Sequence, residues 1–353
     1  MSKILTIVIP TYNAEATINN ALMSLNYKYQ HDFNVLIVDD GGSRPVKKFI
    51  QPWIDRFPSI IKCVRKTNGN WGSVVNYAAR HVNTKFIKIL DADDTFIFDK
   101  LGEIIHYLKH LKSNVDVVLS SFYFSLDMRQ NKITPRKISK KSSIIYTTFD
   151  KFKTNSILTH HALCFNTKFL LNKLHVEERF RFSDNILIYK VILFSKKIAI
   201  LPKQFILYRY HIGVPEQQTS LEQMVNHYQD ARKTLTIISQ IKLDNHMSKR
   251  RIKTLWIILK SMYFFSLILI SLNKKLYFWQ KKMNFELIKK SVEQARKNGY
   301  DKIIKQSPIP FLNKLNFFST KTISVAAFKL IQVGFIKIIK DSERLTKNKK
   351  SIY

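Results

Sequence analysis

Phe86-Ile87-Lys88-Ile89-Leu90-Asp91-Ala92-Asp93-Asp94 is an apolar, alternating run that ends in three carboxylates. The alternation predicts a β-strand, with the acids at its carboxyl end. Hard divalent cations such as Mg²⁺ and Mn²⁺ take oxygen ligands and hold a diphosphate through one or two protein carboxylates. Asp91 and Asp93 have the spacing for such a site. The alternative is a solvated turn in which Asp94 caps the next helix.

The same pattern, an apolar run followed by polar residues, occurs three times before residue 86. These runs lead into Pro10-Thr11-Tyr12-Asn13, into Asp39-Asp40-Gly41-Gly42-Ser43 and into Asn68-Gly69-Asn70-Trp71-Gly72. Helical patterns follow from about residue 14, over 45–56 and over 73–81, so strands and helices alternate. This alternation predicts an α/β fold with a doubly wound, mostly parallel sheet, in which ligands bind outside the carboxyl ends of the strands.

Taken together, these motifs resemble those of the inverting family 2 glycosyltransferases with the GT-A fold, which are Rossmann-like and transfer a sugar from a nucleoside diphosphate donor to an acceptor hydroxyl. The resemblance covers about the first 130 residues. It lies in the segments Val8 to Asn13, Val38 to Ser43, Asn68 to Asn76 and Leu90 to Asp94. A further resemblance, to members that build bacterial cell-surface polysaccharides, lies in Arg181-Phe182-Ser183-Asp184, Tyr208 to Gly213 and Gln217 to Ser220.

The resemblance implies a binding site for a nucleotide-sugar donor at the strand ends. Its donor contacts are Pro10, Thr11, Tyr12, Asp39, Asn68, Trp71 and Asp91, and Asp93 is the ligand of a Mn²⁺ or Mg²⁺ ion that bridges the two phosphates. Tyr12 offers an aromatic face to a flat base. Asp39 can accept the uracil N3–H, which would favour uridine over cytidine. The alternatives are that Tyr12 is a packing aromatic and that Asp39 caps a helix.

Several neighbours of these residues also have two interpretations. Trp71 either stacks on a ligand or packs against its own domain. We expect Asp40 to be a turn residue. Some relatives carry a basic residue near position 70 that meets the base, but here the residue is Asn70, which leaves Arg65 or Lys66 as substitutes.

Inversion at the anomeric carbon requires one base that takes the proton of the attacking hydroxyl. The resemblance places this base at Asp184, which follows Ser183 and opens a helical run. Relatives usually have Glu-Asp or Thr-Asp at this place. The alternative is that the helix dipole alone favours an acid in the first turn, in which case Glu177 or Glu178 would be the base.

Two histidines and a glutamine are predicted near the acceptor or on a closing loop. His160 and His161 are adjacent, and adjacent residues of a strand point to opposite faces, so at most one of them, His161, is expected to face the site. His211, after a strand over residues 205–210, can approach the diphosphate or the metal. With Gln218 it can form a loop that closes over the donor and excludes water, the competing acceptor.

The length of 353 residues predicts two domains. We expect a GT-A domain over residues 1–212, with a nucleotide-binding part over about 1–114 and an acceptor and catalytic part over about 115–212. Residues 213–353 are expected to form a basic, mainly helical domain, with helical patterns over 221–241, 247–272, 285–298 and 321–339.

The formal net charge of +34 is concentrated away from the nucleotide-binding part, because residues 213–353 hold 27 basic and 9 acidic side chains. A nucleic-acid partner is disfavoured: the carboxylate clusters would repel phosphate, and no helix-turn-helix, zinc or ribonucleoprotein signature is present. An anionic membrane surface fits the charge better, since each exposed cation beside such a surface contributes about 1 kcal/mol. A lysine-rich composition without a binding role is the plain alternative.

Leu255 to Leu272 is the strongest apolar run, interrupted by Lys260. It can be a buried bundle helix, a monotopic membrane contact or a span, although a central lysine opposes insertion by roughly 3 kcal/mol. The apolar run near the N-terminus is too short for a signal peptide. Cys63 and Cys164 show no metal or disulfide spacing. We therefore expect the chain to work in the cytoplasm of a bacterium, at the inner face of the cell membrane.

These observations predict a metal-dependent, inverting glycosyltransferase that uses a nucleotide-sugar, most simply a UDP-sugar, and elongates a lipid-linked or cell-surface polysaccharide. A transferase with another nucleotide-activated donor is the first alternative. A non-catalytic, membrane-associated partner of a glycosyltransferase is the second.

Overall fold

The computed structural model describes residues 3–112, 114–125, 133–152, 158–211, 221–301 and 304. Their contacts divide the chain into two compact units. The described residues up to 211 form the first unit together with Ser248–Leu255, and residues 221–247 and those from Trp256 onward belong to the second. The predicted boundary near residue 212 falls in a segment outside the described residues, as does Gln218.

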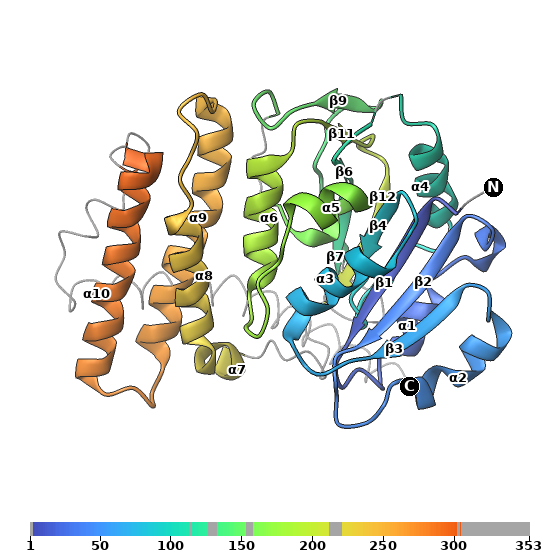
Figure 1. Cartoon of the computed structure of the whole chain (residues 1–353), viewed down its shortest axis with the longest axis horizontal. Coiled ribbons are helices and arrows are strands. Elements are labelled where there is room, and N and C mark those ends of the chain that lie inside the picture. Colours follow the sequence, from blue (N-terminus) through green and yellow to red (C-terminus); the bar gives the residue numbers. More distant parts are fainter. Residues whose placement is uncertain are drawn as a thin grey trace, which may run out of the picture. The chain divides into compact units, whose positions relative to one another are not determined.

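An eight-stranded sheet forms the centre of the first unit, with the strand order β3-β2-β1-β4-β10-β6-β11-β9 (Figure 1). Its strands are β1 Leu5–Thr11, β2 Phe33–Asp39, β3 Ile61–Arg65, β4 Phe86–Ile89, β6 Val117–Leu119, β9 Ile145–Thr147, β10 Leu163–Asn166 and β11 Ile198–Ile200. Strand β1 pairs in parallel with β2 and β4, and β2 pairs in parallel with β3. The predicted α/β fold is therefore confirmed, and the four polar clusters follow four neighbouring parallel strands.

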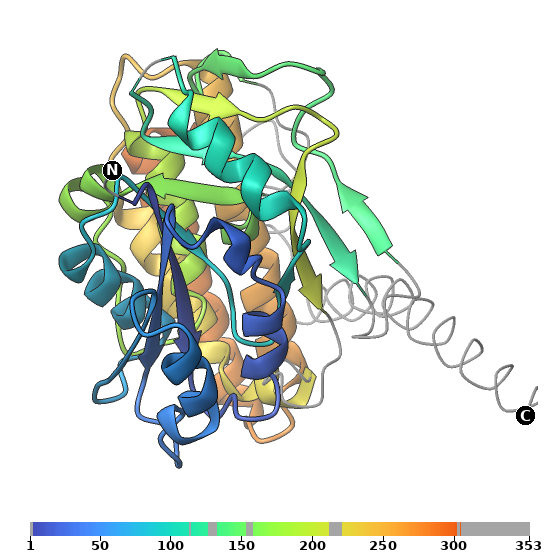
Figure 2. The same ribbon diagram turned by 90° about the vertical axis from the view of Figure 1, so that its right-hand side faces the viewer.

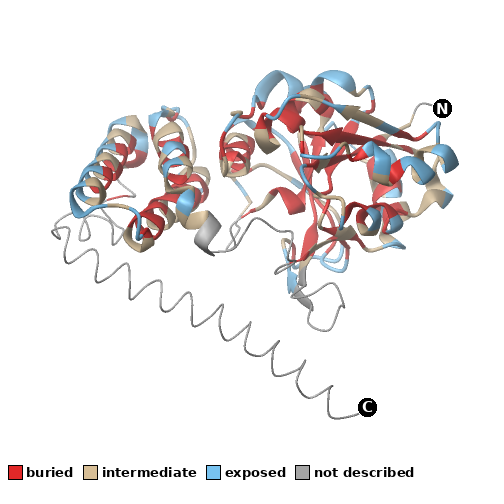
Figure 3. Ribbon diagram, turned by 90° about the horizontal axis from the view of Figure 1, so that it is seen from below, coloured by how far each residue is buried: buried red, intermediate tan, exposed pale blue. Residues whose placement is uncertain are grey.

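The strands form where the sequence is apolar on both faces, as parallel strands covered by helices require. Leu5, Ile7 and Ile9 are buried completely, and so are Phe86 and Ile87 on β4. Figure 3 shows these strands as buried and the surrounding helices with exposed outer faces. The core thus holds the strand ends, and the loops that follow them, in fixed positions.

Helices connect these strands, in the alternation that the sequence predicts. The helices of the first unit are α1 Ile18–Met23, α2 Lys47–Arg56, α3 Asn70–His81, α4 Lys100–Lys109, α5 Thr167–Lys173 and α6 Ser183–Phe194. Helix α3 begins at Asn70 and not near residue 73, so Trp71, which the sequence analysis placed in a loop, lies in its first turn. The helix starts early because the buried Asp40 carboxylate accepts the backbone N–H of Gly69, the residue before it.

A second, four-stranded sheet has the order β5-β12-β7-β8, and its strands β7 and β12 lie side by side in Figure 2. Its strands are β5 Thr95–Phe96, β7 Ser121–Ser125, β8 Ile133–Arg136 and β12 Ile206–His211. His211 is the last residue of β12, and the sequence analysis had placed it after the strand. This sheet brings β12 next to the segment that follows Asp94, since β12 pairs with β5.

The second unit is helical, as predicted. It contains α7 Leu221–Asn226, α8 Tyr228–Gln240, most of α9 Lys249–Leu272, α10 Phe278–Ala295 and a π-helical turn over Arg296–Tyr300. The first turns of α9 belong to the first unit, which the predicted domain boundary had not allowed for. Arg251 explains this, because its guanidinium pairs with Asp150 at 2.7 Å and donates to the carbonyl of Ser195 at 3.0 Å.

Helix α9 contains the apolar run that the sequence analysis singled out. By length and composition it is able to cross a membrane, with a mean hydropathy of 2.0 over its most apolar 18-residue window, of which 61% is buried. Core helices of folded proteins meet the same criterion. The predicted helix over residues 321–339 lies outside the described residues.

Candidate functional site

Asp91 lies at the carboxyl end of β4 and holds the centre of the site. Its Oδ1 accepts the indole N–H of Trp71 at 3.1 Å, and its Oδ2 lies 2.7 Å from Nε2 of His160. Burial by itself raises the pKa of this carboxyl, but the ion pair with His160 outweighs burial and holds the pKa of Asp91 well below its usual range. Asp91 is therefore a fixed negative charge at the end of the central strands.

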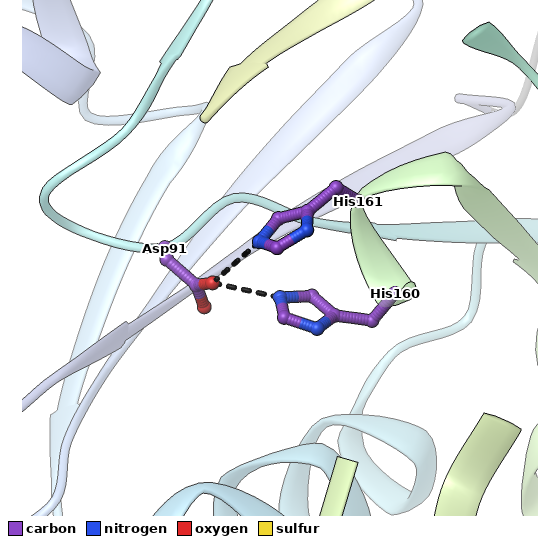
Figure 4. A group of neighbouring side chains, drawn as sticks. All are labelled: Asp91, His160 and His161. Carbon is purple, nitrogen blue, oxygen red and sulfur yellow. Dashed lines mark hydrogen bonds and ion pairs between the residues drawn. The ribbon is translucent and has the colours of Figure 1, made fainter. Parts of the chain in front are cut away.

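His160 and His161 both point at Asp91, as Figure 4 shows. They lie in a 3-10 turn over His160–Ala162 and not in a strand, so they do not alternate between two faces. The expectation that at most one of them faces the site was therefore wrong. Nε2 of His161 lies 3.7 Å from Oδ2 of Asp91 and 3.8 Å from Oδ2 of Asp94.

The two imidazoles differ in charge although they are neighbours. Burial lowers the pKa of His160, but the attraction of Asp91, with a smaller contribution from Asp184, raises it above its ordinary value. Burial, followed by the charge on His160, lowers the pKa of His161 to about 3. His160 is thus the cation and His161 the neutral ring, stacked on Tyr210 with ring centroids 4.5 Å apart.

Lys88 holds the backbone of the turn that carries the two histidines. It is a charged residue inside the buried strand β4, and its Nζ donates to the carbonyls of His161 at 2.5 Å and Leu163 at 2.9 Å. Burial lowers the pKa of Lys88 to about 8. No role was predicted for Lys88 from the sequence. A lysine in the middle of an apolar strand nevertheless indicates a buried hydrogen-bond acceptor, because a buried charge must be paired or hydrogen-bonded.

Asp184 lies in the first turn of α6, where the sequence predicts it, and its side chain is 36% exposed. Its Oδ2 is 4.0 Å from Nδ1 of His160, so one imidazole lies between Asp184 and Asp91. Burial raises the pKa of Asp184, and the positive charge of His160 opposes that rise. The predicted base is therefore next to the strand-end carboxylate and reachable from solvent.

The alternative bases are engaged elsewhere. Glu177 forms an ion pair with Lys190 at 2.7 Å. Glu178 accepts the side-chain amide of Asn76 at 2.7 Å. Asn76, which the motif places on the helix after the Trp71 segment, also donates to the carbonyl of Val176 and thereby acts as a structural contact.

The turn after Asp91 contains the other two acids of the motif. Asp93 is half-buried in this turn, and Asp94 is buried completely. Asp94 accepts the hydroxyl of Tyr208 at 2.6 Å and the backbone N–H of His211 at 2.8 Å, so it anchors β12. Burial, followed by the charges of Asp93 and Asp91, raises the pKa of Asp94 well above its usual range. Asp94 is therefore a supporting residue that holds β12 in place.

The predicted donor contacts of β1 and β2 divide into exposed and buried groups. Tyr12 directly follows β1 and its ring is 46% exposed. Pro10 is half-buried, and Thr11 is buried with its hydroxyl donating to the carbonyl of Val38 at 3.2 Å. Asn68 donates its side-chain amide to the carbonyl of Asp40 at 3.0 Å. Tyr12 is thus the member of this group that offers a free aromatic face.

Asp39 is buried and already occupied by donors from its own chain. Its Oδ1 accepts the N–H of Gly41 at 3.1 Å, and its Oδ2 accepts the N–H of Val46 at 3.0 Å and pairs with Arg65 at 2.9 Å. Lys66 pairs with Asp40 at 2.6 Å in the same way. Both cations considered as substitutes for a base-binding residue therefore fix the loop after β2.

His211 and Gln218 are the remaining residues that the sequence predicts near the site. His211 is buried at the end of β12, and its Nε2 lies 2.9 Å from the hydroxyl of Thr95. His211 therefore does not lie on an exposed loop. Its backbone N–H donates to the carboxylate of Asp94. Gln218 lies outside the described residues, so the proposed closing loop stays a prediction.

Backbone strain gathers around this site. Within the described part of the chain, four residues other than glycine adopt a positive φ: Asn13, Asn70, Arg179 and Phe182. Asn13 follows β1, Asn70 opens α3, and Phe182 precedes α6 with a φ of 65°. Strained residues persist where the surroundings fix them, and they are common at functional sites. The sequence analysis had no signal for these conformations.

Residues that can hold a metal ion are present. Among the described residues, the ligand atoms of Asp91, His160 and His161 all lie within 4.8 Å of one another. Two imidazole nitrogens and a carboxylate oxygen suit Mn²⁺ and other transition metals. Asp93, the predicted ligand, is half-buried and lies two residues after Asp91 in the sequence; it is not part of this group.

Comparisons with known proteins agree with this geometry. The family model "Glycosyl transferase family 2" matches residues 6–179. An uncharacterized glycosyltransferase of Mycoplasma pneumoniae is 34% identical over 131 residues, which are 36% of this chain and 42% of the relative. The chain therefore spans less than half of that relative. The minor teichoic acid biosynthesis protein GgaB of Bacillus subtilis is 21% identical over 62% of this chain and 24% of its own length.

Solved structures share the fold. TarS of S. aureus in complex with UDP-GlcNAc has a TM-score of 0.63 and 18% identity, and the match covers 83% of this chain and 81% of TarS. The mannosyltransferase PcManGT of Pyrobaculum calidifontis in complex with GDP-Man and Mn²⁺ has a TM-score of 0.51 and 15% identity, with 94% and 86% covered. Through its N-terminal domain, the chain belongs to the family 2 glycosyltransferases of the GT-A type.

Proposed function

We propose that the chain is an inverting, metal-dependent transferase that moves a sugar from a nucleoside diphosphate to a hydroxyl of an acceptor saccharide. The relation between Asp91, His160 and Asp184 carries the proposal. Asp91 ends the central strand β4, Asp184 opens α6, and the imidazole of His160 lies between them, 2.7 Å from one and 4.0 Å from the other. The donor edge of the sheet and the predicted base thus meet in one place.

Asp184 is the base in this proposal. It takes the proton of the acceptor hydroxyl while the oxygen attacks the anomeric carbon of the sugar. The bond from that carbon to the diphosphate breaks on the opposite face, so the configuration inverts and the nucleoside diphosphate leaves. Burial strengthens Asp184 as a base by raising its pKa, and the cation at His160 keeps the carboxyl from being protonated too early.

Asp93, Asp91 and the two histidines are the residues that would hold a divalent cation. Such an ion neutralises the charge of a leaving diphosphate. Ligating histidines must be neutral. His161 meets this condition because burial and the charge on His160 lower its pKa, whereas His160 would have to release its proton to bind the ion. PcManGT, whose fold this chain shares, is described in complex with Mn²⁺.

The donor is a UDP-sugar in the first form of this proposal. The support is the fold shared with TarS, which is described in complex with UDP-GlcNAc. A GDP-sugar is the second candidate, because PcManGT is described with GDP-Man. Asp39 gives little support for uridine, since its carboxylate already accepts hydrogen bonds from Arg65 and from the following loop.

The names of two relatives support our choice of acceptor class. GgaB and a teichoic acid poly(glycerol phosphate) polymerase of Staphylococcus epidermidis both carry teichoic acid in their names, and the latter is 34% identical over 91 residues. We propose a lipid-linked or cell-surface polysaccharide as the acceptor, and the inner face of the bacterial cell membrane as the place of work.

A screen of nucleotide-sugars tests this function. The thermal stability of the full chain should rise with a UDP-sugar and Mn²⁺ together, since a ligand that binds only the native state stabilises it by mass action. A larger rise with GDP-sugars would favour the second donor. No rise with any nucleotide-sugar, and no hydrolysis of any of them in the presence of Mn²⁺, would contradict the proposal.

A further inference from the structure

The turn between α9 and α10 exposes a group of large apolar side chains. Tyr277 is 72% exposed, Phe278 51%, Trp279 62% and Met283 52%. We name residues 274–283 the aromatic tip; the turn lies at one end of the helical unit (Figure 1). Clustered exposed apolar side chains mark interaction sites, whereas single ones are ordinary.

Hydrogen bonds fix the conformation of the aromatic tip, so it is not a frayed helix end. Asn273, which precedes it, is buried; its side chain donates to the carbonyl of Val225 at 3.1 Å and accepts the N–H of Lys275 at 2.9 Å. The backbone N–H of Tyr277 donates to the side chain of Gln280 at 2.9 Å. These bonds hold the turn in one conformation, so its apolar side chains are kept outside the core.

The inward face of α10 is separate from these side chains. Phe285, Ile288 and Val292 are buried and follow the helical spacing of one face. The aromatic residues precede this face at the start of the helix, where they contribute little to packing. Their exposure therefore marks this end of the helix as a candidate interaction surface.

The charges around the tip indicate the chemistry of that partner. Residues 274–283 contain four lysines, at 274, 275, 281 and 282, and no acidic residue. Lys274, Lys275 and Lys282 are exposed. Lysine is depleted in protein–protein interfaces. Aromatic rings at the level of lipid headgroups, flanked by lysines, are instead typical of the interface between water and an anionic bilayer.

We propose that the aromatic tip docks the chain on an anionic membrane surface. Tyr277, Trp279 and Met283 enter the headgroup region, and the lysines lie beside the anionic lipids. The apolar run within α9, which the sequence analysis considered for this role, is largely buried. The proposal does not depend on the transferase chemistry, because none of these residues belongs to the candidate site.

Co-sedimentation of the full chain with vesicles tests the proposal. The wild-type chain should bind phosphatidylcholine vesicles that contain roughly one-third phosphatidylglycerol, and should bind pure phosphatidylcholine at least tenfold more weakly. Changing Tyr277, Trp279 and Met283 together to Ser should lower the binding at least tenfold. The matched control changes Met23 and Leu171 to Ser; these side chains are 56% and 48% exposed in the first unit, and their loss should leave binding unchanged.

A second pair of variants tests the charges. Lys274→Gln with Lys275→Gln should reduce binding about tenfold at low salt, as expected for cations beside anionic lipid. Lys47→Gln with Lys48→Gln removes the same charge from an exposed site on α2 and should reduce it much less. Circular dichroism and the melting temperature of each variant verify that it is folded.

Three outcomes would overturn the proposal. The first is a wild-type chain that does not bind the anionic vesicles. The second is binding that the triple serine variant and the Lys274/Lys275 variant retain in full. The third is a wild-type chain that self-associates without binding vesicles and becomes monomeric in the serine variant, because the tip would then be an interface between copies.

Discussion

Nε2 of His160 lies 2.7 Å from Oδ2 of Asp91, and the other nitrogen of the same ring lies 4.0 Å from Asp184. One imidazole thus lies between the two carboxylates: it is hydrogen-bonded to the one at the end of β4 and within ion-pair range of the one at the start of α6. Asp91 and Asp184 both belong to sequence motifs that resemble those of the family, whereas His160 belongs to none of these motifs.

Asp184→Asn keeps the shape of the side chain and removes the proton acceptor. Transfer should fall by about 10²- to 10⁴-fold, the usual contribution of a positioned general base, while donor affinity is retained. Turnover with an acceptor and donor binding are measured on the same preparation. Glu177→Gln and Glu178→Gln are the matched variants, and a larger loss in either of them would place the base there instead.

His160→Ala leaves Asp91 buried without its cation. We expect donor affinity and transfer both to fall, because Asp91 then loses the ion pair that fixes its orientation and keeps the hydrogen bond from the indole of Trp71. Isothermal titration with the donor and steady-state transfer are the measurements. His175→Ala, whose residue is exposed before α6, is the control. Equal activity of His160→Ala and wild type would show that the bridge is not used.

Asp93→Ala tests the predicted metal ligand. Metal-dependent donor binding should be lost, and the melting temperature should change little, since Asp93 is a half-buried turn residue at the edge of the core. Chelation of the wild-type chain should give the same loss and Mn²⁺ should reverse it. If Asp93→Ala retains wild-type turnover at limiting Mn²⁺, the ion is held by Asp91 and the histidines without it.

Lys88→Met removes a buried donor and leaves the carbonyls of His161 and Leu163 without it. The free energy of unfolding should fall by about 2–4 kcal/mol, because each unsatisfied buried carbonyl costs about 1–3 kcal/mol. Chemical denaturation of both proteins gives this difference. Lys85→Met, an exposed lysine that precedes the same strand, is the control and should cost much less.

The same lysine also predicts a pH dependence of stability. Its pKa is about 8 in the folded chain and 10.5 in the unfolded chain, so between these values the unfolded chain holds more protons. The free energy of unfolding contributed by Lys88 therefore rises from pH 8 to pH 10.5 and is constant below that window. The difference between wild type and Lys88→Met, followed over this range, isolates the effect from the buried tyrosines. A difference that does not vary with pH would contradict the lowered pKa.

The sheet was predictable from the sequence because each parallel strand is an apolar run that ends in polar residues. The strand-end rule then places Thr11, Asp39 and Asp91 at one edge without any knowledge of packing. Asp184 came from a motif at the start of a helix, and the structure brings it within 4.0 Å of His160. These are local patterns, which a single sequence displays.

What the sequence did not reveal depends on residues that are distant along the chain. The 3-10 turn directs both histidines to Asp91, and it is held by Lys88, 73 residues before His161. The Asp39 carboxylate is engaged within the chain because it pairs with Arg65, its neighbour on the adjacent parallel strand. The early start of α3 depends on Asp40, 29 residues before Gly69. Such partners become visible only when the fold is known.

Gly72 touches no predicted ligand, yet a β-carbon at this position would lie 2.1 Å from the carbonyl oxygen of Glu177. The helix that carries Trp71 is thus packed against the segment that leads to Asp184, and the backbone N–H of Arg179 joins the two by donating to the carbonyl of Gly69 at 2.7 Å. In evolutionary terms, this glycine can drift only if both segments change with it. Sequence variation should therefore be slower at residue 72 than its distance from the chemistry suggests, and substitutions there should co-vary with those at 176–179.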